Sequence, residues 1–79
     1  MTHEIKILPQ YFEDVITGKK GFEVRKNDRN YKVNDIVILK EYYRGKFTGR
    51  EETRKITYML TDKIAGIETG FCVFGISQL

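Results

Sequence analysis

The sequence is poor in the side chains from which metal centres and nucleophilic sites are usually built. It contains one cysteine, one histidine and one serine among 79 residues. A metal site needs several ligands close together, and His3 and Cys72 stand far apart in the chain, so no metal site is expected. A serine–histidine–aspartate arrangement would have to recruit Ser77, and no glycine-rich phosphate-binding motif is present. We therefore expect no metal and no cofactor, and we interpret His3 as a surface or edge residue.

The single cysteine also excludes an intramolecular disulfide. A chain this small with neither a disulfide nor a set of metal ligands is typical of the cell interior. Cys72 lies in the apolar run Gly70–Ile76, so we interpret it as a buried, unreactive thiol. There is no apolar segment near Met1 and no apolar stretch long enough to span a bilayer. These features predict a soluble cytoplasmic protein without a membrane partner.

The chain has room for one domain, so residues 1–79 are expected to form a single unit. Its net charge is +3, and the charge is distributed unevenly. Residues 18–55 hold twelve of the fourteen Lys and Arg residues against six acids, whereas the rest of the chain is net negative. This asymmetry fits a surface that faces a polyanion. It equally fits a well-solvated surface, because the acids are interleaved with the cations.

Apolar alternation and turn residues predict five strands and one short helix. Pro9 suits the first turn of the helix, and Gly18 is expected to end it as a left-handed cap. A basic loop between Tyr43 and Glu52 is expected to form an extended hairpin. So many strands in a short chain predict a mainly β (α+β) fold, a small, mostly antiparallel, five-stranded pseudo-barrel whose helix covers one opening. The predicted strands are His3–Leu8, Phe22–Asn27, Ile36–Tyr43, Thr53–Thr61 and Phe71–Ile76, and the predicted apolar stripe of the helix is Tyr11, Phe12, Val15 and Ile16.

The polar groups that could carry a function converge directly after the helix. Lys19 and Lys20 follow the expected cap, and Glu23 and Arg25 lie two residues apart on a half-buried strand, so they share its ionic face. A carboxylate beside a guanidinium presents acceptor and donor edges together, which suits a nucleobase or a ribose, with lysines nearby for phosphate. The alternative interpretation is an ordinary salt bridge on a solvated face.

The segment Gly18–Arg25, GKKGFEVR, matches the G-x-K-x-x-E-x-R signature of ASCH domains in the PUA-like superfamily. The chain resembles a phage- and prophage-associated ASCH-like family of unknown function over nearly its whole length. The resemblance implies a PUA-like β-barrel whose cleft binds RNA or a nucleotide, with Lys20, Glu23 and Arg25 as its floor. Lys19, Arg29 and Arg50 would be outlying phosphate contacts. The further segments that carry the resemblance are His3–Leu8 with Tyr11 and Phe12, Arg25–Arg29, Asp35–Leu39 and Thr48–Arg50.

An enzyme is the second hypothesis, because some ASCH relatives are small amidohydrolases that act on a modified nucleoside. Their lysine corresponds to Lys20, but their nucleophilic threonine corresponds to Glu23, which has no hydroxyl. The segment Thr61–Thr69 is also too short to hold the helical region that carries their distant glutamate. Both departures count against this activity, although Thr17 and Thr48 leave hydroxyls in the chain.

The third hypothesis is a protein-interaction module, such as a phage factor acting on a host component, with the loop Tyr43–Arg50 as its contact surface. Aromatic residues alternate with cations in and before this loop, which is a pattern of single-strand binders. Phe47, expected at the loop tip, is the most suggestive of them. We expect either Tyr42 or Tyr43 to pack into the core. The aromatic residues are Tyr31, Tyr42, Tyr43 and Phe47, and the cations are Lys32, Lys40, Arg44, Lys46 and Arg50.

Overall fold

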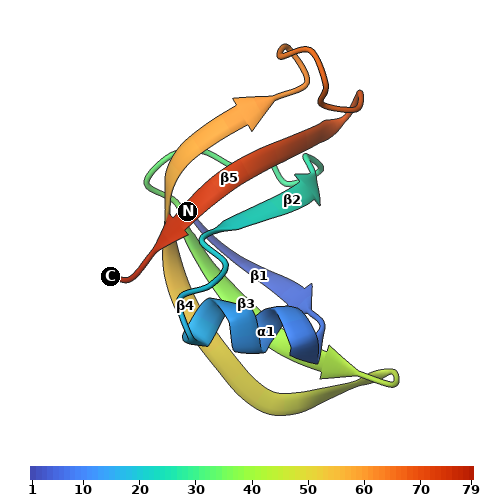
Figure 1. Cartoon of the computed structure of the whole chain (residues 1–79), viewed down its shortest axis with the longest axis vertical. Helices are drawn as coiled ribbons and strands as arrows, with labels where there is room; N and C mark the ends of the chain where they lie inside the picture. Colours follow the sequence, from blue (N-terminus) through green and yellow to red (C-terminus); the bar gives the residue numbers. More distant parts are fainter.

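The computed structural model describes all 79 residues, which form five strands and one helix (Figure 1). The sheet order is β1-β3-β4-β5-β2. β1 pairs with β3 in parallel, and the other three pairings are antiparallel. The elements are β1 (Thr2–Ile7), α1 (Pro9–Ile16), β2 (Phe22–Lys26), β3 (Ile36–Tyr43), β4 (Lys46–Thr61) and β5 (Phe71–Ser77). The mainly β, five-stranded, mostly antiparallel fold with one short helix after the first strand is confirmed.

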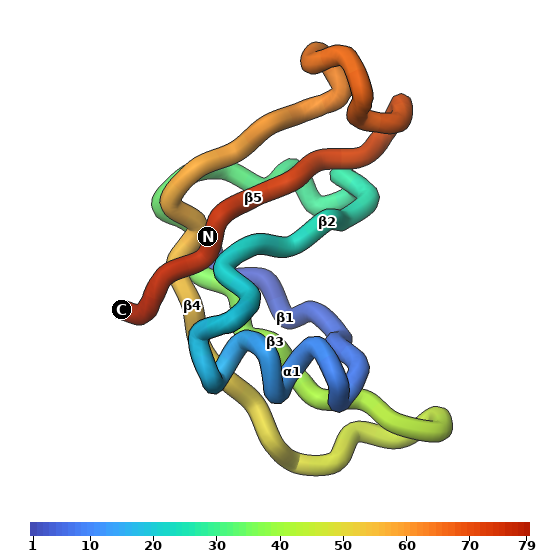
Figure 2. The backbone as a smooth tube through the Cα atoms, viewed as in Figure 1, coloured from blue at the N-terminus to red at the C-terminus, as the bar shows by residue number.

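The sheet curls into a half-barrel and does not close. β1 and β2 are its two edges, and no ladder joins them. The chain passes from one edge to the other through α1, which lies within the curve of the sheet (Figure 2). Gly18 follows the end of α1 with a φ of 82°, and so forms the left-handed cap predicted from the sequence. No helix of the chain has the length and apolar character needed to cross a membrane.

The long strand β4 belongs to both halves of the half-barrel because irregularities bend it. Three of its residues, Thr48–Arg50, stand opposite the single residue Glu41 of β3, and Gly49 has a φ of 94°. A second shift, at Thr57, lies between the pairs that β4 makes with β5. Extra residues in one strand of a pair bend that strand and strengthen its twist. β4 therefore continues from one half to the other without a loop.

The β3–β4 hairpin is tighter than the sequence predicts. Its two central residues, Arg44 and Gly45, have φ values of 50° and 80°, as a two-residue type I′ turn requires. Tyr43 consequently pairs directly with Lys46, and β4 begins there instead of at Thr53. The predicted basic loop is thus an extended hairpin, and most of it is strand.

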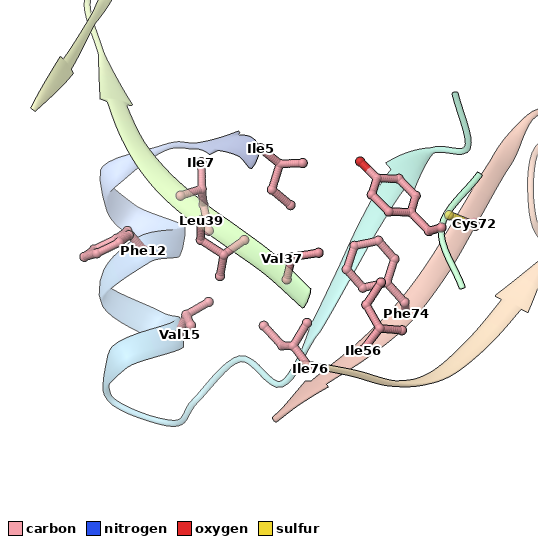
Figure 3. Close-up of a cluster of buried hydrophobic side chains, with 11 residues drawn as sticks. Ile5, Ile7, Phe12, Val15, Val37, Leu39, Ile56, Cys72, Phe74 and Ile76 are labelled. Carbon is pink, nitrogen blue, oxygen red and sulfur yellow. The ribbon is translucent and has the colours of Figure 1, made fainter. Parts of the chain in front are cut away.

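The core fills the concave side of the sheet beneath α1 (Figure 3). Phe12 and Val15 of the helix are buried, as predicted, whereas Tyr11 is exposed. Cys72 is buried as predicted, and this burial raises the pKa of its thiol. The buried apolar residues are Ile5, Ile7, Phe12, Val15, Tyr31, Val37, Leu39, Ile56, Cys72, Phe74 and Ile76.

Two predictions about aromatic residues are wrong, and the prediction for His3 holds only in part. His3 lies on the edge strand β1, as expected, but its side chain is buried, with Nε2 2.8 Å from Oδ2 of Asp35, because the carboxylate satisfies the ring nitrogen. Tyr31, proposed for stacking on a base, packs between His3 and Phe74 in the core, and this burial raises the pKa of its hydroxyl. Neither Tyr42 nor Tyr43 joins the core, because the hairpin that carries them extends beyond it.

Candidate functional site

A cleft lies where the half-barrel stays open, along the gap between the edge strands β1 and β2, which we call the seam. Its volume is about 500 Å³. The two strands contribute its sides, and the start of α1 and the turn after the helix contribute one end. Apolar and aromatic side chains line it together with three cations and one acid. The lining residues are Lys6, Ile7, Leu8, Tyr11, Lys20, Phe22, Glu23, Val24 and Arg25.

The strand β2 turns its ionic face inward. Glu23 is buried and Arg25 is half-buried, whereas Phe22 and Val24 are about half exposed. The half-buried strand is confirmed, but its buried side is the ionic one. A carboxylate tolerates such a position only when cations and hydrogen-bond donors compensate for the lost water. The inward face thus brings three of the predicted residues, Lys20, Glu23 and Arg25, together at the cleft.

Glu23 is held between two cations. Its side chain is only 4% exposed. Nε of Arg25 donates to Oε1 at 3.0 Å, and Nζ of Lys20 donates to Oε2. Lys20 also donates to the backbone carbonyl of Phe22 at 2.7 Å. Both carboxylate oxygens are therefore engaged, and Glu23 fixes where the two cationic groups lie.

Two arginines reach across the seam to the free edge of β1. Nη2 of Arg25 donates to the carbonyl of Lys6 at 2.6 Å, and Nη1 of Arg29 donates to the carbonyl of Glu4. Carbonyls two residues apart in a strand point to the same side, so both belong to the edge that has no strand partner. The guanidinium groups supply the donors that a neighbouring strand would have supplied.

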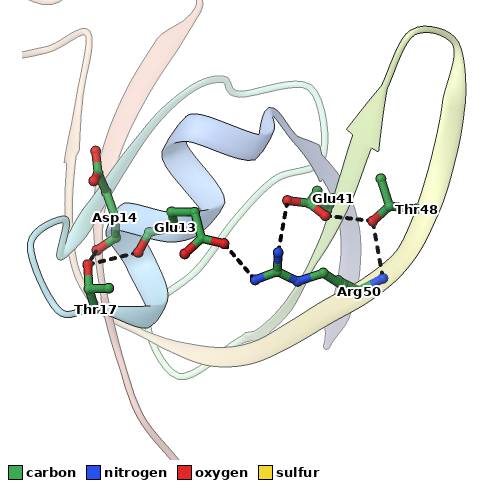
Figure 4. A network of polar contacts seen from close by, with 6 residues as sticks. All are labelled: Glu13, Asp14, Thr17, Glu41, Thr48 and Arg50. Carbon is green, nitrogen blue, oxygen red and sulfur yellow. Dashed lines mark hydrogen bonds and ion pairs between the residues drawn. The ribbon is translucent and has the colours of Figure 1, made fainter.

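Arg50 does not reach the cleft and instead ties the hairpin to the helix (Figure 4). Nη2 donates to Oε1 of Glu13 at 2.8 Å, and the guanidinium carbon lies 4.7 Å from the ring centroid of Phe12. Nη1 is 3.7 Å from the buried Glu41, which also accepts a hydrogen bond from Thr48 at 2.7 Å. The hydrogen bond to Glu13 is the main cause that raises the pKa of Arg50.

Replacing Arg50 by alanine should loosen α1 without unfolding the protein. The helix would lose its ion pair to the hairpin and the cation over Phe12, and exposed contacts of this kind contribute little to global stability. We expect backbone amides of α1 to exchange several-fold faster, as measured by hydrogen exchange with mass spectrometry. Arg44→Ala is the control, because Arg44 stands in the hairpin turn, stacks on the neighbouring Tyr43 and pairs with no residue of the helix. Equal exchange in both variants would show that Arg50 does not hold the helix.

The other predicted residues lie at or near the cleft. Lys19 is exposed on the turn beside it and does not line it. Arg29 lies in a second hollow of about 280 Å³, which continues along the same seam and shares Lys6 and Arg25 with the cleft. The seam is thus one path from α1 to Arg29, and five cations flank it. The cations are Lys6, Lys20, Arg25, Lys26 and Arg29, and the acids are Glu23 and Asp28.

The sequence did not indicate Lys6 and Tyr11 as part of the site. Lys6 alternates with the buried Ile5 and Ile7, so the sequence alone marks it as an ordinary outward residue, and only the position of β1 beside the seam brings it into the site. Tyr11 was assigned to the apolar stripe of the helix, yet its ring lies 5.6 Å from Nζ of Lys20. Its position two residues after Pro9, in the first turn of α1, places it at the cleft. No group of three or more histidine, cysteine or acidic side chains could hold a metal ion.

Comparison with known proteins places the chain in a family. Over 55 residues it is 49% identical to a protein of Escherichia phage P2, described as an uncharacterized 12.9 kDa protein in the GpA 3'region. That stretch covers 70% of this chain and 50% of the phage protein, so the chain spans about half the length of its relative. Residues 2–76 match the family described as a domain of unknown function, DUF3850. Because the match covers nearly the whole chain, the protein belongs to the DUF3850 family.

Proposed function

We propose that this domain is an ASCH-like, PUA-like module that binds RNA or a nucleotide in the cleft between β1 and β2. The observation that carries the proposal is the pairing of Lys20 and Arg25 around a buried carboxylate, beside an apolar wall. Cations held in place by Glu23 are preorganised for phosphate, because little side-chain freedom remains to be lost on binding. The G-x-K-x-x-E-x-R resemblance points to the same three residues.

The walls of the cleft suit the rest of a nucleotide. Tyr11 and Phe22 both stand beside Lys20, whose Nζ lies 5.6 Å and 5.4 Å from their ring centroids. Aromatic rings beside a cation are the groups on which a base can stack while its phosphate is neutralised. Lys6 and Arg29 extend the cationic path along the seam, and Lys19 remains an outlying phosphate contact in this proposal.

The role of Glu23 differs from the one inferred from spacing. Both of its oxygens already accept hydrogen bonds from Lys20 and Arg25, so it positions these cations and does not read a base edge. The lining of the cleft also supports binding over amide hydrolysis, because it contains no serine, threonine or cysteine. Thr17 donates to the carbonyl of Glu13, and Thr48 donates to Glu41 in the hairpin.

Titration of a fluorescently labelled single-stranded RNA, followed by anisotropy at two salt concentrations, tests the proposal. If about three phosphates are neutralised, the logarithm of the binding constant should fall with the logarithm of salt concentration with a slope of about −2. Lys20→Ala and Lys6→Ala should each weaken binding by about tenfold, since a charge-assisted hydrogen bond contributes about 1.5 kcal/mol or more. The proposal fails if wild type shows neither salt-sensitive binding nor a nucleotide-induced rise in Tm.

The matched control is Lys63→Ala, which removes an exposed lysine from the connection between β4 and β5, away from the seam. It changes the net charge by the same amount and should leave the affinity within about twofold of wild type, because exposed charges outside the site are largely screened. Lys6 has no ion-pair partner in the fold, so Lys6→Ala keeps the test decisive if Lys20→Ala proves unstable. If Lys6→Ala and Lys63→Ala weaken the affinity equally, then binding depends on the overall charge of the protein and not on the cleft.

A further inference from the structure

The cluster formed by Lys6, Lys40, Tyr42 and Phe47 lies next to the seam and is explained neither by the fold nor by the cleft. Tyr42 and Phe47 pair across the β3–β4 hairpin with ring centroids 5.1 Å apart. Neither ring belongs to the buried cluster, and Phe47 is 51% exposed. Exposed aromatic rings that contribute nothing to a core are typical of a contact surface.

Cations lie over both rings. Nζ of Lys6 is 4.4 Å from the ring centroid of Tyr42, and Nζ of Lys40 is 4.9 Å from that of Phe47. Lys6 also lines both hollows of the seam, so its ammonium group joins the cleft to the hairpin. β1 and β3 pair in register here, Lys6 opposite Lys40, which places the two lysines on the same outer face.

The charge of the hairpin favours one kind of occupant. From Tyr42 to Phe47 the chain carries two cations, Arg44 and Lys46, and no acid. Glu41, the nearest acid before this segment, is buried on the inner side and engaged by Thr48 and Arg50. On the outer face Lys40 is paired with Glu4, so the charge that remains available beside the rings is that of Lys6. Aromatic rings next to an available cation are complementary to unstacked bases joined by phosphates.

We propose that the hairpin cluster is a second contact for single-stranded nucleic acid, and that the strand runs from the cleft past Lys6 onto Tyr42 and Phe47. This inference rests on the proposed function of the cleft and specifies its ligand as a single strand several nucleotides long. A duplex keeps its bases stacked inside, so it could offer these rings only its backbone. The shared chemistry is base plus phosphate, from either RNA or DNA.

The experiment compares Phe47→Ala with Tyr58→Ala, which removes a ring at least as exposed from the other half of the sheet. Anisotropy would be measured for single-stranded RNA and DNA of about 4 and about 16 nucleotides, the range of site sizes for small β-barrel domains, and for a duplex of the longer sequence. Mononucleotide binding would be followed by the shift in Tm.

We expect Phe47→Ala to weaken binding of the longer single strand by about tenfold, and to leave mononucleotide binding unchanged, because one stacked base is lost. Tyr58→Ala should match wild type with every probe. The inference is overturned if Phe47→Ala and Tyr58→Ala bind the longer strand equally, or if the duplex binds as tightly as the single strand. In those cases mononucleotide binding that is sensitive to Lys20→Ala would leave the cleft proposal intact, whereas no binding of any probe overturns both.

Discussion

Replacing Glu23 by alanine is expected to lower the free energy of unfolding by about 3 kcal/mol. The buried carboxylate compensates two cations, and its removal leaves Lys20 and Arg25 close together without a compensating negative charge. The side chains of both cations keep some contact with water, at 19% and 25% exposure, so the expected cost lies at the lower end of the range for broken buried ion pairs. Urea unfolding followed by circular dichroism measures the change.

The control for this prediction is Glu4→Ala. Glu4 also accepts from a lysine, Lys40 at 3.0 Å, but its side chain is 63% exposed. Removal of such a surface pair should change the free energy of unfolding by less than about 1 kcal/mol. If Glu23→Ala lowers the free energy of unfolding no more than Glu4→Ala does, then Glu23 does not compensate the cations of the cleft and does not preorganise them.

Replacing Asp35 by alanine is expected to cost about 2 kcal/mol, because several donors lose their acceptor at once. Oδ2 accepts from the ring of His3 at 2.8 Å and from the backbone N–H of Lys32 at 3.1 Å. A carboxylate can only accept, so Nε2 of His3 carries the hydrogen. Since His3 is buried, its ring nitrogen would have no water to replace the lost bond. Thermal unfolding at neutral pH measures the loss.

The same carboxylate makes stability depend on pH. The hydrogen bond from His3 is the largest cause that holds the pKa of Asp35 below its ordinary value of about 4. A pKa lowered by folding stabilises the protein above the unfolded value, and this stabilisation disappears as the pH falls through the folded value. The difference in stability between wild type and Asp35→Asn should therefore be largest near neutral pH and shrink in acid. A difference that stays constant from neutral to acidic pH would contradict this prediction.

The sequence predicted the elements well because their signals are local. Alternation along Ile5–Ile7 and Ile36–Tyr43, the proline at the start of α1 and the glycine after it each act over a few residues. The start of β4 was placed too late because Arg44, a residue that rarely adopts positive φ, occupies the first central position of the turn. The hairpin is consequently longer than its composition suggests.

The site could be predicted only in part. Spacing put Glu23 and Arg25 on one face of a strand, but alternation cannot say which face is buried when the strand is an edge. Only the topology places β1 opposite β2, and so brings Lys6 and Tyr11 to Lys20. The fold also explains why Arg50 contacts the helix and not the cleft. Arg50 lies in the bulge at Thr48–Arg50, and its side chain reaches Glu13 and Glu41.

The arginines that cross the seam also disfavour self-association through this edge of the sheet. An open sheet has two edges, and an unpaired edge is a template on which a strand from another molecule can add and begin an aggregate. Here Arg25 and Arg29 already occupy the carbonyls of Lys6 and Glu4 that an incoming strand would need. Their positive charges also repel a second copy of the same edge. The half-barrel can therefore keep an accessible seam without polymerising through it.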